Sequence, residues 1–135
     1  MKVSKGVEAL VNEALAEVTT LSAAEVKAKK DAPGVMLIDL RDIRELQREG
    51  RIPGSIHIPR GMLEFWLDPE SPYYKPAFDD ANEVVLYCNK GWRSALAAKS
   101  LQSMGMESVS HMDGGMTQWV ADGGDIEPLP PRPQK

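Results

Sequence analysis

Short apolar runs alternate with segments of helical period along this chain. Residues 35–39 and 83–88 are largely apolar and are bounded by turns or charges. Runs of this length are typical of strands that are buried on both faces of a parallel sheet. A turn followed by a brief strand is expected over residues 52–59, and a last strand over residues 108–112.

Between these runs lie segments with the pattern of helices. Over residues 7–18 apolar side chains recur at steps of three and four, which predicts an amphipathic helix lying on the domain. Ser22 and Glu25 can cap each other's free backbone N–H groups, so a second helix is expected from there to about Lys30. Further helices are predicted over residues 42–48, 94–104 and 116–121.

Two segments have no regular period. Residues 68–82 contain three prolines and are expected to form a long surface loop, and loops of this length tend to serve a site. From Ile126 onward, four prolines in ten residues predict a solvated tail that need not fold.

Strands that alternate with helices predict an α/β domain, with a central, mostly parallel sheet flanked by helices on both sides. A length of 135 residues suits one such domain but not two. We therefore expect an N-terminal helical extension over residues 1–19, the α/β domain over residues 20–124 and a Pro-rich tail over residues 125–135.

Composition narrows the class of partner. The chain is 42% hydrophobic and 27% charged, as in soluble globular proteins, and its net charge is −4 without a run of five like charges. This argues against nucleic acid and anionic membranes as partners. Charged residues interrupt the apolar pattern of residues 7–18, so this segment is neither a signal-peptide core nor a membrane span. We expect a cytoplasmic protein.

Cys88 is the single cysteine, so it cannot form an internal disulfide. The two histidines, His57 and His111, are too few for a Cys/His zinc site, and neither a metal nor a cofactor is expected. Both histidines lie in strand patterns, where they are more often packing or surface residues than bases.

Cys88 stands at the carboxyl end of a predicted strand, where sites form in parallel sheets. The turn that follows it reads Asn89-Lys90-Gly91-Trp92-Arg93-Ser94. If this turn curls as a cradle, its N–H groups, the next helix and the charges of Lys90 and Arg93 all favour the thiolate, which is the nucleophilic form. The alternative is a buried structural cysteine, but these neighbours favour a reactive one.

Four motifs resemble the rhodanese family of sulfurtransferases over about residues 20–123. They are Ile38-Asp39-Leu40-Arg41 with Glu45, the segment Gly50 to Pro59, the segment Val84 to Arg93 with its Cys-x4-Arg loop, and Asp113-Gly114-Gly115-Met116 with Trp119. The family often has histidine at the position of Arg51 and an aromatic residue at the position of Met116. Neither position is expected to touch the cysteine.

The resemblance implies a persulfide cycle on Cys88, without a cofactor. Thiosulfate or a similar small donor would supply the sulfur, and a thiol, cyanide or a protein would accept it. The N–H groups of residues 89–93 would stabilise the persulfide, Lys90 and Arg93 would attract the dianionic donor, and Trp92 would form a wall of the pocket mouth.

The resemblance also suggests supporting residues. Asp39, Arg41 and Glu45 are expected to hold the loops together rather than to catalyse. Arg60, Glu64, Phe65 and Trp66 follow the third predicted strand. They either shape the acceptor pocket or form a surface helix with packed aromatics.

Three other functions remain open at this point. A cysteine phosphatase or arsenate reductase of the same fold would have five residues between cysteine and arginine, whereas four separate Cys88 from Arg93. A non-catalytic binding or regulatory module is a second alternative, although such modules have often lost the cysteine. A carrier that passes persulfide sulfur to a protein partner shares the chemistry and differs in the acceptor.

Overall fold

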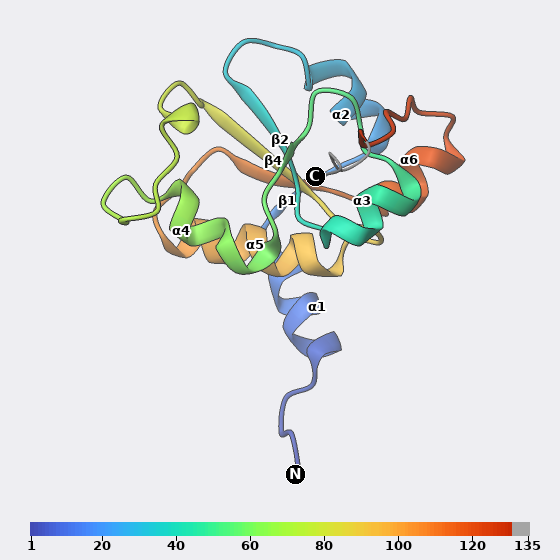
Figure 1. Ribbon diagram of the computed structural model, residues 1–135. Coiled ribbons are helices and arrows are strands. Elements are labelled where there is room, and N and C mark those ends of the chain that lie inside the picture. Colours follow the sequence, from blue (N-terminus) through green and yellow to red (C-terminus); the bar gives the residue numbers. More distant parts are fainter. Residues whose placement is uncertain (131–135) are drawn as a thin grey trace, which may run out of the picture.

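The computed structural model describes residues 1–130 and has a five-stranded parallel sheet at its centre (Figure 1). The strand order is β1-β5-β4-β2-β3. The predicted parallel α/β fold is therefore confirmed. The strands are β1 (Thr19–Leu21), β2 (Val35–Asp39), β3 (Ile56–His57), β4 (Glu83–Tyr87) and β5 (Val109–Met112).

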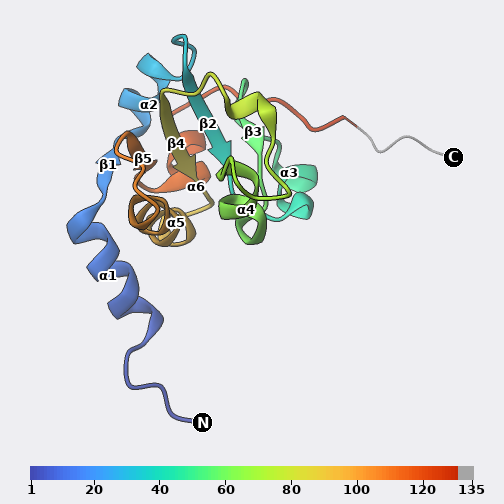
Figure 2. The same cartoon turned by 90° about the vertical axis from the view of Figure 1, so that its left-hand side faces the viewer.

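Helices cover both faces of the sheet (Figure 2). One face is covered by α1 (Val7–Glu17), α4 (Leu63–Leu67) and α5 (Trp92–Ser103), and the other by α2 (Ala23–Lys29) and α6 (Gly115–Ala121). The helix α3 (Ile43–Glu49) lies beside β3, and 3-10 turns form at Arg60–Met62 and Pro76–Phe78.

Alternation along the inner strands builds two cores. Ile38 of β2 and Leu86 of β4 face the side of α4 and α5, whereas Leu37 and Val85 face the side of α2 and α6. All four side chains are at most 2% exposed. β4 is thus the central strand and is fixed on both faces, which gives the residue after it a rigid support.

The N-terminal helix and the cap of the second helix are as predicted. Val11 and Ala14 of α1 are buried against Ala95 of α5, while the N-terminal end of α1 projects beyond the sheet (Figure 2). Ser22 and Glu25 form the reciprocal capping box at the start of α2. Within residues 1–130, no helix has the length and apolar character that a bilayer crossing needs.

Two features differ from the sequence predictions. The strand β1 was not predicted, because its three residues lack an apolar run and gain strand structure by pairing with β5. The predicted tail is ordered at its start, where Glu127 and Arg51 exchange backbone hydrogen bonds of 2.8 and 2.9 Å. Residues 131–135 of that predicted tail lie outside the described part.

Candidate active site

Cys88 follows the last residue of the central strand and is 1% exposed. The backbone N–H of Gly91 donates a hydrogen bond to Cys88 Sγ at 3.1 Å. Gly91 has φ +106°, a conformation that side chains rarely adopt, and α5 begins at the next residue. A backbone donor and the positive end of a twelve-residue helix therefore meet at the sulfur.

The helix α6 holds the cysteine loop from behind. Two N–H groups of its first turn, from Met116 and Thr117, donate to the carbonyl oxygens of Cys88 and Asn89 at 2.8 and 3.0 Å. A Cβ on Gly115 would lie 2.4 Å from the Cys88 carbonyl oxygen, so glycine is required for this close approach. The expectation that Met116 does not touch the cysteine is therefore wrong, since the contact is made by its backbone.

The loop residues predicted from the sequence surround one cavity of about 420 Å³. It is lined by Cys88, Asn89, Lys90, Trp92 and Arg93. Trp92 is 51% exposed and so stands at the mouth rather than in a core. Lys90 is exposed, and no carboxylate within residues 1–130 pairs with it. The cavity thus has a sulfur, an aromatic wall and a cation.

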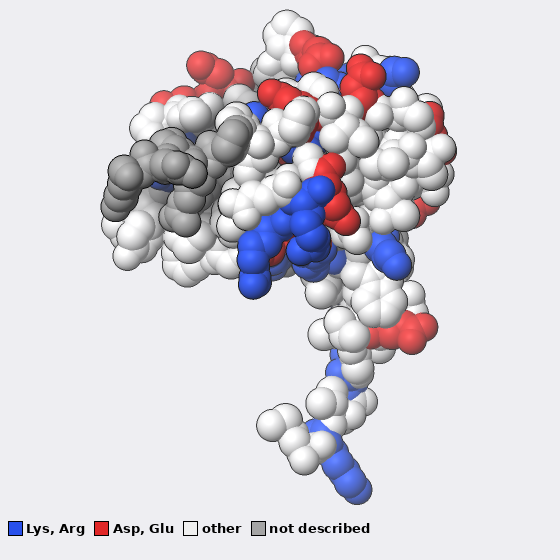
Figure 3. Space-filling model, turned by 45° about the vertical axis from the view of Figure 1, so that its right-hand side comes forward, with Lys and Arg blue, Asp and Glu red and all other residues white. Residues whose placement is uncertain are grey.

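Arg93 differs from Lys90, because its guanidinium forms an ion pair with a carboxylate. Both terminal nitrogens of Arg93 donate to Glu45 of α3, at 2.8 and 2.9 Å. The hydrogen bonds from Arg93 lower the pKa of Glu45, so the pair stays charged. In Figure 3, basic side chains gather in the middle of the face with acidic ones directly beside them. Arg93 therefore links the loop to α3 while also lining the cavity, and its expected contact with an anionic donor stays a prediction.

Asp39 and Arg41 form a buried ion pair at the end of β2. Both side chains are fully buried, and Arg41 Nη2 lies 2.8 Å from Asp39 Oδ2. The remaining donors of Arg41 contact Glu49 Oε2 at 3.1 Å and the Gly50 carbonyl at 2.7 Å. The pair thereby ties the end of β2 to the C-terminal end of the helix that carries Glu45.

Arg60 and Glu64 do not line the cavity around Cys88. They pair with each other at 2.9 Å, and Ser100, in the second half of α5, donates to Glu64 at 2.6 Å. Phe65 packs edge-on against Tyr73, and the Lys75 ammonium lies 4.8 Å above the Trp66 ring. These contacts favour the surface helix with packed aromatics, and a role of these residues in an acceptor pocket stays a prediction.

A row of side-chain contacts behind Cys88 was missed by the sequence reasoning. Ser94 Oγ lies 3.6 Å from Cys88 Sγ and 2.9 Å from His111 Nδ1. The other ring nitrogen of His111 lies 3.1 Å from Thr20 Oγ1. His111 is 1% exposed, and burial lowers the pKa of its imidazole even though Asp113 acts in the opposite sense. The available signal was a histidine in the strand predicted after the cysteine loop.

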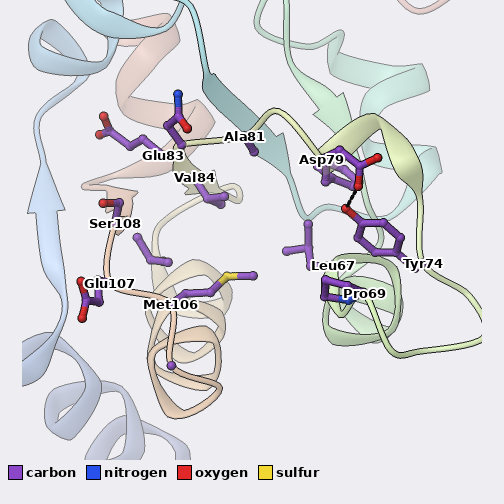
Figure 4. A pocket seen from close by; sticks show the side chains of 14 residues that line it. Leu67, Pro69, Tyr74, Asp79, Ala81, Glu83, Val84, Met106, Glu107 and Ser108 are labelled. Carbon is purple, nitrogen blue, oxygen red and sulfur yellow. Dashed lines mark hydrogen bonds between the residues drawn. The ribbon is translucent and has the colours of Figure 1, made fainter.

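A second cavity, of about 580 Å³, lies at the opposite ends of the strands (Figure 4). Residues of the segment 68–82, such as Tyr74 and Asp79, form part of its wall, and Glu83 and Ser108 lie at the starts of β4 and β5. The long loop therefore lines this second cavity and not the one at Cys88, and its service to a site stays a prediction.

A buried cysteine at the carboxyl end of the central parallel strand, facing a helix N-terminus, defines a cysteine-centred α/β domain. The chain belongs to the rhodanese-like domain family, which matches residues 22–122. Sulfurtransferases are among its relatives. The thiosulfate:glutathione sulfurtransferase of Saccharomyces cerevisiae is 38% identical over 101 residues, which are 71% of this chain and 72% of that protein.

Two solved structures share the fold over most of the chain. A protein of unknown function from Rhodopseudomonas palustris, described as a possible tyrosine phosphatase, is 46% identical, with a TM-score of 0.89 and coverage of 94% of this chain and 98% of that one. The polysulfide-sulfur transferase homodimer of Wolinella succinogenes is 32% identical, with a TM-score of 0.67 and coverage of 89% and 85%. Three of the curated relatives are spanned for only 55 to 72% of their length.

Proposed function

We propose that this protein is a sulfurtransferase that moves sulfane sulfur from thiosulfate, or a similar anionic donor, to a thiophilic acceptor through a persulfide on Cys88. The observation that carries the proposal is the position of Cys88. Its sulfur accepts a hydrogen bond from the Gly91 N–H and lines an open cavity beside the exposed cation of Lys90. The family relationship to sulfurtransferases supports the same chemistry.

The reaction needs no change in net oxidation state and no cofactor. The Cys88 thiolate attacks the outer sulfur of thiosulfate, a new S–S bond forms, and sulfite leaves with the electron pair of the old S–S bond. The persulfide anion then forms next to the Gly91 N–H and the start of α5, which stabilise negative charge there. Cyanide or a thiolate takes the terminal sulfur and returns the Cys88 thiolate.

Arg93 favours sulfur transfer over the phosphatase alternative. A phosphatase of this kind would need a guanidinium that can hold two phosphate oxygens. In this protein, each terminal nitrogen of Arg93 donates one hydrogen bond to Glu45, so a phosphate would compete with that carboxylate for the guanidinium. The description of the relative from Rhodopseudomonas palustris as a possible tyrosine phosphatase makes the comparison worth a direct assay.

The test is thiosulfate:cyanide sulfur transfer by the wild type and by Cys88→Ser, with hydrolysis of p-nitrophenyl phosphate measured in parallel. We expect the wild type to form thiocyanate and Cys88→Ser to form none, because a serine hydroxyl is a far weaker nucleophile toward sulfur. Polysulfide replaces thiosulfate in a second arm. Phosphate release without sulfur transfer from either donor would contradict the proposal.

Replacing Lys90 by alanine is expected to raise the KM for thiosulfate by about two- to fivefold while kcat changes little, since an exposed cation contributes modestly to anion binding. The effect should shrink in high salt, where surface charges are screened. Lys99→Ala is the matched control, because Lys99 lies on α5 outside the cavity lining. An unchanged KM for Lys90→Ala would show that this cation does not attract the donor.

A further inference from the structure

We propose that His111, acting through Ser94, accepts the proton of the Cys88 thiol and so produces the nucleophilic thiolate. His111 does not line the cavity at Cys88 and is therefore a positioning residue rather than a catalytic one. Its importance for turnover rests on the proposed sulfur transfer. Activation of Cys88 can nevertheless be measured without any sulfur donor.

The geometry provides a continuous route for the proton. Three elements meet here: the end of β4 supplies Cys88, the first turn of α5 supplies Ser94, and β5 supplies His111. Ser94 lies 3.6 Å from the sulfur and 2.9 Å from His111 Nδ1, and all three side chains are at most 1% exposed. Hydrogen bonds that are sealed from water in this way polarise one another.

One arrangement of protons satisfies every member of the row. Ser94 Oγ also lies 3.2 Å from the Gly91 carbonyl, so His111 Nδ1 at 2.9 Å is the nearer acceptor. If the Ser94 hydroxyl donates to Nδ1, the imidazole proton is on Nε2 and points to Thr20 Oγ1 at 3.1 Å. The lone pairs of Ser94 are then left for the Cys88 S–H.

The transfer moves two protons in the same direction. The Cys88 S–H bond breaks and leaves its electron pair on sulfur, while the proton bonds to Ser94 Oγ. The original hydroxyl proton of Ser94 passes to His111 Nδ1. The products are a thiolate, an unchanged serine hydroxyl and an imidazolium, so the charges balance.

The surroundings stabilise the thiolate that the transfer creates and keep the acceptor imidazole neutral before the transfer. The thiolate faces the Gly91 N–H and the start of α5. Burial keeps the imidazole neutral and able to accept a proton in the resting state, because it lowers the pKa of His111. Asp113, in the turn after β5, favours the imidazolium. The outer partner, Thr20, is exposed and leads the second ring N–H toward solvent.

The test is the rate of Cys88 alkylation by iodoacetamide as a function of pH, in the wild type and in His111→Asn. The asparagine amide oxygen can accept the Ser94 hydrogen bond near the position of Nδ1, but it cannot take up the proton. We expect the alkylation rate at pH 7 to fall by about tenfold, and the pH of half-maximal rate to rise by about one unit. A packing role alone would leave the profile unchanged.

Three further variants extend the test. Ser94→Ala breaks the same route and should shift the profile in the same sense, and the double variant should lose no more than either single one. Ser94→Ala also gives an independent result if thermal melting shows that His111→Asn does not fold. His57→Asn is the matched control. His57 lies on β3 and contacts the Arg41 carbonyl, so Cys88 of this variant should react as in the wild type.

Additive losses, or a wild-type profile for His111→Asn and Ser94→Ala, would overturn the relay. The outcome of the alkylation test is independent of whether the protein transfers sulfur. If the variants shift the pH profile of alkylation but the wild type transfers no sulfur, the relay stands and the sulfurtransferase proposal fails. If the wild type transfers sulfur but the variants do not shift the profile, the proposed function stands and the relay fails.

Discussion

Replacing Arg41 by alanine is expected to lower the free energy of unfolding by about 3–5 kcal/mol, because it leaves a buried carboxylate without its counter-charge. Asp39 and Arg41 are both fully buried, and Arg41 Nε and Nη2 contact the Asp39 carboxylate at 3.0 and 2.8 Å. The substitution also removes the donor to the Gly50 carbonyl. Urea denaturation followed by circular dichroism measures the loss.

Arg44→Ala is the control for this prediction. Arg44 pairs with Asp42 at 3.0 Å, but its side chain is 79% exposed, so water replaces the lost contact. We expect its denaturation midpoint to match that of the wild type. Equal midpoints for Arg41→Ala and Arg44→Ala would show that the buried pair does not hold β2 and α3 together.

Replacing Gly115 by alanine is expected to reduce the rate of sulfur transfer by about 100-fold, because the cysteine loop must shift to make room for the methyl group. A Cβ at this position would lie 2.4 Å from the Cys88 carbonyl oxygen and 2.6 Å from the Asn89 carbonyl carbon. Both neighbours are backbone atoms of the loop that aims the Gly91 N–H at the sulfur. Single-turnover transfer from thiosulfate to cyanide reports the rate.

Gly123→Ala separates this clash from simple backbone strain. Gly123 also has a positive φ, +79°, but a Cβ added there would meet no atom within 4 Å beyond its immediate neighbours in the chain. It should therefore lose some stability and keep the wild-type rate of sulfur transfer. A Gly115→Ala protein that is as active as Gly123→Ala would mean that the close approach of α6 does not position the loop.

The inner strands could be predicted from the sequence because their apolar runs are intrinsic to the chain. Residues 35–39 coincide with β2, and Tyr87 ends β4 directly before Cys88. The strand β1 could not be predicted this way, since Thr19 and Thr20 are exposed and become a strand only through their pairing with β5.

In the candidate site, too, local features could be predicted from the sequence and long-range contacts could not. The loop from Cys88 to Arg93 is contiguous, so its gathering around one cavity followed from a strand-to-helix turn. The partner of Arg93 is Glu45, 48 positions away, and His111 is 17 positions from Ser94. Tertiary packing therefore decides which loop cation is neutralised and which histidine lies behind the cysteine. A local sequence pattern does not contain this information.

If Cys88 carries sulfur, the sulfur adds to the mass of the intact protein. After incubation with thiosulfate and removal of the excess, we expect a gain of one sulfur atom in the wild type and no gain in Cys88→Ser. Added cyanide should return the wild type to its original mass. If the mass stays unchanged after both thiosulfate and polysulfide, in a folded wild-type protein whose Cys88 still reacts with iodoacetamide, Cys88 does not carry sulfur.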